Sequence, residues 1–102
     1  MDHVQQLIQE EKAKIVAQTA KIHWQELEKF YAQGKCILVS DTLNLVDVGY
    51  AISMDDANHV IEWMESGLLQ KDFKDVAQSW HDNDEEIWSV VINPWVLVQK
   101  KI

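Results

Sequence analysis

Residues 87–99 read Ile87-Trp88-Ser89-Val90-Val91-Ile92-Asn93-Pro94-Trp95-Val96-Leu97-Val98-Gln99, two runs of β-forming side chains separated by an Asn-Pro pair. Branched and aromatic side chains favour strands, and asparagine and proline favour turns, so this stretch predicts a C-terminal β-hairpin. Proline cannot take the positive φ of a two-residue primed turn. The expected connection is therefore a longer type I turn with Pro94 at its second position, or else a bend within one strand.

Short helical segments and one buried strand precede the hairpin. Apolar side chains recur at intervals of three and four residues, as on one face of a helix, within residues 24–31, 45–52, 57–64 and 73–80. Asn44 and the pair Asp55-Asp56 stand where helix N-terminal caps belong, and Gly34 and Gly67 stand where helices end. Between the first two segments, Cys36-Ile37-Leu38-Val39 is continuously apolar and predicts a buried strand.

Residues 1–20 predict a long N-terminal helix, since they are polar with sparse apolar positions and contain neither glycine nor proline. Ile8, Ile15 and Ile22 follow at intervals of seven, as at one position of a coiled-coil repeat, but polar residues occupy the companion positions. A helix with so narrow an apolar stripe is stable only when the stripe packs against another surface. That surface is either the body of its own domain or a second subunit.

The order of these elements predicts one α+β domain over residues 1–102, in which several short helices pack on a small antiparallel sheet that ends in the hairpin. From Trp24 onward the order is helix, strand, helix, turn, helix, short strand, a further helix and the hairpin. Without the further helix, this is the element order of a winged-helix domain.

Composition and charge exclude several classes of protein. A hydrophobic fraction of 47% with five tryptophans is far above that of disordered chains. No apolar run approaches a membrane span, the N-terminal residues lack a signal-peptide pattern, and the single cysteine cannot form an internal disulfide. We therefore expect a cytoplasmic protein. The net charge of -8 and the lack of arginine disfavour nucleic-acid binding, which usually needs a basic face.

Carboxylates and histidines give the candidate metal ligands. Asp56, His59 and Glu62 follow at intervals of three along one helical segment, and His81 opens a second acidic cluster. Solvated acids at a helix cap beside a surface histidine explain the same residues, and the set lacks the paired cysteines common in structural zinc sites. No phosphate-binding or dinucleotide-binding glycine motif occurs, so we expect no cofactor and no catalytic residue.

Five tryptophans recur about once per element, and they fall into two groups. Trp24 and Trp80 lie on apolar faces that predict core positions, whereas Trp63, Trp88 and Trp95 are candidate interaction residues. Alternation along residues 87–92 makes both faces of that strand largely apolar. Either the second face serves association with another protein, or the N-terminal helix or the 73–81 helix covers it.

The chain as a whole resembles a family of small bacterial proteins that is classed only as a domain of unknown function. The resembling stretches are residues 19–27 and 45–48, then Trp63-Met64-Glu65-Ser66-Gly67, and most specifically Pro94-Trp95-Val96-Leu97-Val98-Gln99. The resemblance implies family membership, and it carries no activity or catalytic residue to these positions.

Three functional hypotheses remain from these observations. The leading one is a small non-catalytic domain that acts through protein contacts, as a homo-oligomer or as an accessory subunit of another protein. The first alternative is a helix-turn-helix regulator that binds nucleic acid; its second helix would begin near Asp56 and expose Asn58, His59, Glu62 and Glu65. The second alternative is a small metal-binding protein or enzyme.

Overall fold

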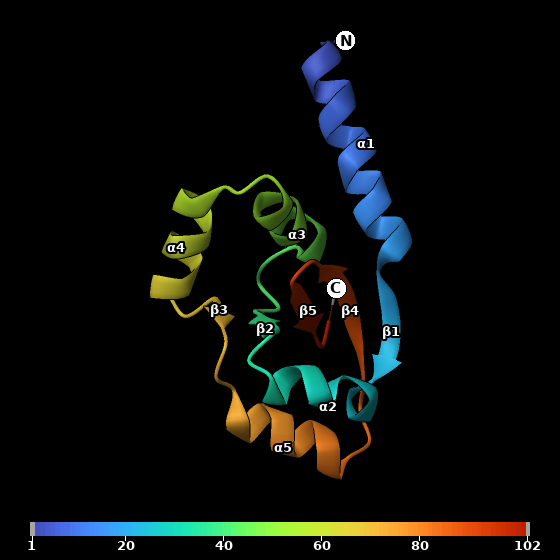
Figure 1. Ribbon diagram of the computed structural model, residues 1–102, viewed down its shortest axis with the longest axis vertical. Helices are drawn as coiled ribbons and strands as arrows, with labels where there is room; N and C mark the ends of the chain where they lie inside the picture. Colours follow the sequence, from blue (N-terminus) through green and yellow to red (C-terminus); the bar gives the residue numbers. More distant parts are fainter. Residues whose placement is uncertain (1, 102) are drawn as a thin grey trace.

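The computed structural model describes residues 2–101, and these residues form helices on both sides of a five-stranded sheet (Figure 1). The elements, in chain order, are α1 (His3–Gln18), β1 (Ala20–His23), α2 (Trp24–Ala32), β2 (Cys36–Val39), α3 (Leu45–Ser53), α4 (Ala57–Glu65), β3 (Leu69–Gln70), α5 (Lys74–Asp82), β4 (Glu86–Ile92) and β5 (Trp95–Gln99). The α+β class is confirmed, and so is the expected order of elements from Trp24 onward.

The strand order in the sheet is β1-β4-β5-β2-β3. Strands β1 and β4, β4 and β5, and β2 and β3 pair antiparallel, whereas β2 and β5 pair parallel, with Ile37 opposite Leu97. The sheet is thus mixed, where the sequence had led us to expect antiparallel pairing throughout. The parallel pair needs a long crossover, which the chain supplies with every element between β2 and β5. Local periodicity carries no information about this long-range partner.

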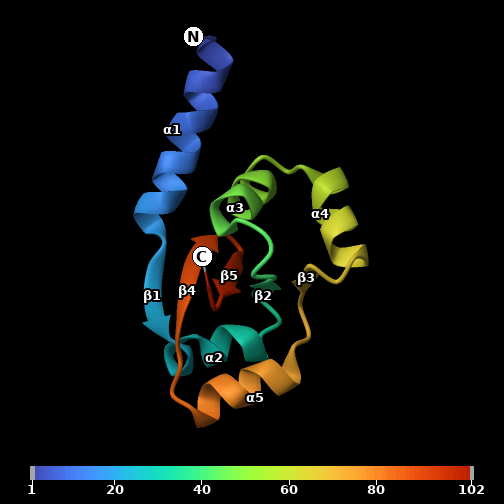
Figure 2. The ribbon, with the colours of Figure 1, turned by 180° about the vertical axis from the view of Figure 1, so that it is seen from behind.

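Helices cover the two faces of the sheet in two separate layers (Figure 1). Helices α2 and α5 pack on one face, and α1, α3 and α4 lie over the other; the view from behind shows the same division (Figure 2). Alternate strand residues enter the two cores: Cys36, Ile87, Val96 and Val98 on the α2 side, and Ile37, Val39, Val90 and Leu97 on the α3 side. The chain's own helices therefore cover both apolar faces of the hairpin, although Val91 remains exposed.

The β4–β5 hairpin is tighter than expected. Ile92 pairs with Trp95, so Asn93-Pro94 is a two-residue connection, and its peptide bond is cis. Pro94 therefore stands third in the four-residue turn, where a cis proline belongs, and not second as a type I turn requires.

The N-terminal helix is shorter than predicted, because it ends at Gln18 and the chain enters β1 at Ala20. Thr19 is extended, and its hydroxyl donates a hydrogen bond of 2.7 Å to the carbonyl of Ile15. Ile22 consequently lies in a strand that pairs with β4, so the seven-residue repeat does not continue beyond Ile15. Met1, the first residue of the predicted helix, lies outside the described residues.

Side-chain caps and glycines set the ends of the short helices α2, α3 and α4. The Asn44 side chain accepts hydrogen bonds from the backbone N–H groups of Val46 and Asp47, and Asp56 accepts one from His59. Gly34 and Gly67 follow α2 and α4 with φ of 74° and 75°, a conformation that glycine adopts without steric cost. These four positions behave as the sequence predicted.

Candidate functional site

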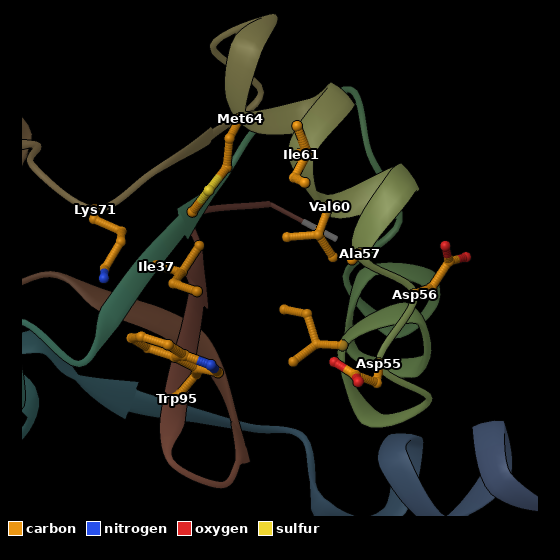
Figure 3. A pocket seen from close by; sticks show the side chains of 10 residues that line it. Ile37, Asp55, Asp56, Ala57, Val60, Ile61, Met64, Lys71 and Trp95 are labelled. Atoms are coloured by element: carbon orange, nitrogen blue, oxygen red, sulfur yellow. The ribbon is translucent and has the colours of Figure 1, made fainter.

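An open apolar groove of about 370 Å³ lies between α4 and the body of the domain (Figure 3). Its apolar lining comes from α3, α4, β2 and β5 and consists of Ile37, Ile52, Ala57, Val60, Ile61, Met64 and Trp95. The groove exists because α4 stands away from the sheet: none of its residues is fully buried, and Ile61 is 53% exposed. An apolar concave surface of this size is typical of a binding site.

Charged side chains mark opposite sides of the groove. Lys71 and Trp95 lie on one side, and Asp55 and Asp56 lie on the other (Figure 3). The ammonium nitrogen of Lys71 is 4.4 Å from the centroid of the Trp95 ring, a favourable cation–π contact. A bound molecule would therefore meet a cation at one side, the Asp55 carboxylate at the other and hydrocarbon between them, because the Asp56 carboxylate points away from the groove and pairs with His59 (Figure 3).

A second uncovered apolar surface lies on α1, whose N-terminal part projects beyond the body of the domain (Figure 1). Val4, Leu7 and Ile8 share one helical face, which we call the α1 stripe. Val4 is 58% exposed and Leu7 is 48% exposed. Further along the same face, Ile15 is buried on the body. The α1 stripe therefore continues the helical face that Ile15 buries, but nothing in the described chain covers it. Helix α1 packs on its own domain only through its C-terminal half.

The candidate metal ligands do not form one site. Nδ1 of His59 lies 2.6 Å from Oδ2 of Asp56, the N-cap of the same helix. This hydrogen bond lowers the pKa of the Asp56 carboxyl. His81 lies on α5 and pairs instead with Glu28 of α2. Within residues 2–101, no group of three or more His, Cys, Asp or Glu side chains is placed to hold a metal ion. Glu62 is exposed on α4.

The three tryptophans predicted to mediate interaction are all half-buried and pack against the core on the α3 side of the sheet. The ring of Trp63 lies beside His59, and Trp88 lies below the ammonium group of Lys21. Trp95 alone among the three lines the groove. Trp24 and Trp80 are core residues, as predicted, and their rings meet edge to face.

The family of the chain is shown by a match that spans residues 10–100. The matching family carries the description "Protein of unknown function (DUF2288)". The chain belongs to the DUF2288 family. The resemblance that we drew from residues 19–27 and 94–99 is confirmed.

A solved structure supports the fold of this DUF2288 chain. The chain is similar to PA1075 from Pseudomonas aeruginosa, whose solution structure was determined by NMR, with 38% sequence identity and a TM-score of 0.78. The similarity covers 88% of this chain and 83% of that one. No curated protein matches the DUF2288 chain.

The helix-turn-helix alternative gains no support from this DUF2288 structure. The outer face of α4 exposes Asn58, His59, Glu62 and Glu65, and it carries no lysine. Such a face would be repelled by the phosphates that flank the major groove.

Among residues 2–101, no helix combines the length and the apolar character needed to cross a bilayer.

The groove is the part of the candidate site that sequence reasoning missed. The apolar face of residues 57–64 gave the available signal, but periodicity shows only that a helix has an apolar face. It does not show how far that helix stands from the sheet. The exposure of Ile61, together with the absence of any buried residue on α4, reveals the groove.

Proposed function

We propose that this protein is a non-catalytic cytoplasmic domain that acts as a homo-oligomer. The observation that carries the proposal is that one chain holds two apolar surfaces that its own packing leaves uncovered, the groove beside α4 and the α1 stripe. Contiguous exposed apolar surface marks contact sites between proteins. A cysteine without a disulfide partner supports the cytoplasmic location.

The net charge of the chain bears on which partner is favoured. At -8, the domain would be repelled by nucleic acid and by anionic membranes. Its uncovered surfaces are apolar, and burial of apolar area is the main favourable contribution to protein association. A second copy supplies both surfaces at the same concentration as the first. Two copies of charge -8 also repel each other, so salt, which screens this repulsion, should strengthen their association.

Sedimentation equilibrium tests the proposal over protein concentrations from about 1 µM to about 1 mM, a range that brackets weak and moderate association. We expect the average mass to rise above that of one chain as the concentration increases. The Ile61→Lys variant, which places a charge on the groove wall, should reduce this rise. Val91→Lys is the matched control, because Val91 is also exposed but lies outside both surfaces. A strict monomer over the whole range would overturn the proposal.

A further inference from the structure

We infer that the projecting half of α1, residues 3–10, lies in the groove beside α4 of a second copy, and that the two copies exchange these helices reciprocally. This inference rests on the homo-oligomer proposed above and names the surfaces that hold it together. It assigns one occupant to the groove and one binding surface to the α1 stripe.

The stripe cannot enter the groove of its own chain. The C-terminal half of α1 is fixed to the body through Ile15, which contacts Gly49 of α3, and through an ion pair of 3.1 Å between Lys12 and Asp47. Helix α4 lies on the other side of α3 from α1 in both views (Figures 1 and 2). The projecting half points away from the body, so only another molecule can bring a stripe to a groove.

The spacing of the stripe suits a helix that binds in a groove. Such helices bind with side chains at positions i, i+3 and i+4, and Val4, Leu7 and Ile8 have this spacing. The groove meets them with the aliphatic side chains of α3 and α4 and with the Trp95 ring, all directed toward the same space (Figure 3). Burial removes the stripe and the groove walls from water together.

Pairing of one α1 stripe with another is the simplest rival arrangement. It would bury only three apolar side chains from each copy and leave both grooves open. A specific interface commonly needs about 1,000 Å² or more of buried surface, so an arrangement that buries more of the uncovered apolar side chains is favoured. Reciprocal exchange covers two stripes and two grooves, and it gives a closed dimer with two-fold symmetry.

Crosslinking between two differently labelled variants tests the arrangement directly. One chain carries Leu7→Cys and the other carries Met64→Cys, and the mixture is treated with a short bismaleimide. The native Cys36 is buried, so the engineered thiols are the reactive ones. We expect a covalent heterodimer from the mixture and little product from either variant alone. A Val16→Cys chain is the matched control, because Val16 is exposed on α1 but lies outside the stripe.

The outcomes separate this inference from the homo-oligomer itself. A sedimenting dimer that crosslinks between two Leu7→Cys chains, and not between Leu7→Cys and Met64→Cys, would overturn the exchange and leave the homo-oligomer standing. Absence of both crosslinks in a dimer would overturn the exchange as well. A monomer at every concentration would overturn both.

A charge placed in the stripe should weaken the dimer. We expect Leu7→Lys to raise the dimer dissociation constant by about 100-fold or more, because the reciprocal dimer contains the contact twice and each buried leucine contributes about 10-fold or more. Val16→Lys should leave the constant within about threefold of the wild-type value, as substitutions outside an interface generally do. Equal effects of the two substitutions would count against the exchange.

Discussion

Ile15 of α1 packs directly on the backbone of Gly49 in α3. A Cβ atom built at Gly49 would lie 3.3 Å from Cγ2 of Ile15 and 3.5 Å from Cδ1 of Ile92. The missing side chain therefore allows two helices to approach closely, and this contact fixes the direction in which α1 leaves the body. It is the structural basis of the projecting stripe.

We expect Gly49→Val to destabilise the domain by about 1–3 kcal/mol, because branched methyl groups would enter space that Ile15 and Ile92 fill. Gly49→Ala is the control: its gain in helix propensity, about 1 kcal/mol, offsets a contact of 3.3 Å that requires Ile15 to move by only a few tenths of an ångström. Urea unfolding measures both free energies, and hydrogen exchange shows whether α1 is released. Equal stability of the valine variant and the wild type would contradict the tight contact.

A buried amide ties the last strand to the turn before α3. The side chain of Gln99 is fully buried, and its Nε2 donates hydrogen bonds of 2.8 Å to the carbonyls of Ser40 and Leu43. We expect Gln99→Leu to lower the free energy of unfolding by about 1–3 kcal/mol, because both carbonyls lose a hydrogen-bond partner. Gln99→Glu should cost more, since it buries a carboxyl group without a donor. Gln25→Ala, at an exposed position of α2, is the control in urea unfolding.

The ion pair between Glu28 and His81 should make stability depend on pH. His81 of α5 forms a hydrogen bond with Glu28 of α2. This hydrogen bond raises the pKa of His81 above its ordinary value of 6.5. A raised pKa in the folded state means that the pair stabilises protonated His81. Its contribution is fully present below the ordinary value and is lost as the pH rises through the raised value.

The difference in stability between wild type and His81→Gln should accordingly be largest below the ordinary pKa of 6.5 and should shrink as the pH rises above it. The effect is small because both side chains are partly exposed to solvent. Glu28→Gln should reproduce it, and the double variant should add nothing further. Thermal unfolding across this range provides the measurement, and a difference that grows with pH would refute the assignment.

Burial should make the only cysteine unreactive in the folded protein. The Cys36 side chain is fully buried in β2, and burial raises the pKa of its thiol to about 11. Thiolates are the reactive species, so Ellman's reagent should react slowly with native protein and rapidly after unfolding in urea. Rapid reaction under native conditions would show that the strand opens. The same measurement validates the crosslinking experiment.

Features that depend on neighbouring residues could be predicted from the sequence, whereas features that depend on the pairing or packing of distant segments could not. The hairpin, the cap residues Asn44 and Asp56 and the buried strand at Cys36 depend on neighbouring residues, and the structure confirms all of them. The end of α1 at Thr19 escaped notice because no glycine or proline marks it. Its extended conformation follows from the pairing of β1 with a strand that lies far along the chain.

The candidate site was predicted only in part. Trp95 was identified as an interaction residue, and it lines the groove, but the expected uncovered face of the hairpin is covered by the chain's own helices. A strand that is apolar on both faces is expected to be covered on both faces. Its sequence does not show whether the covering segments belong to the same chain or to a partner. The distance of α4 from the sheet, which creates the groove, follows from the loops and from tertiary packing. The spacing of apolar residues along α4 does not determine this distance.

The central place of β5 in the sheet has a consequence for biosynthesis. Strand β5 lies between β4 and β2, so the pairs β1–β4 and β2–β3 have no hydrogen-bonded link without it. A shortened product that lacks residues 95–99 can build helices but cannot join the two halves of its sheet. Such a product should therefore be a substrate for proteases.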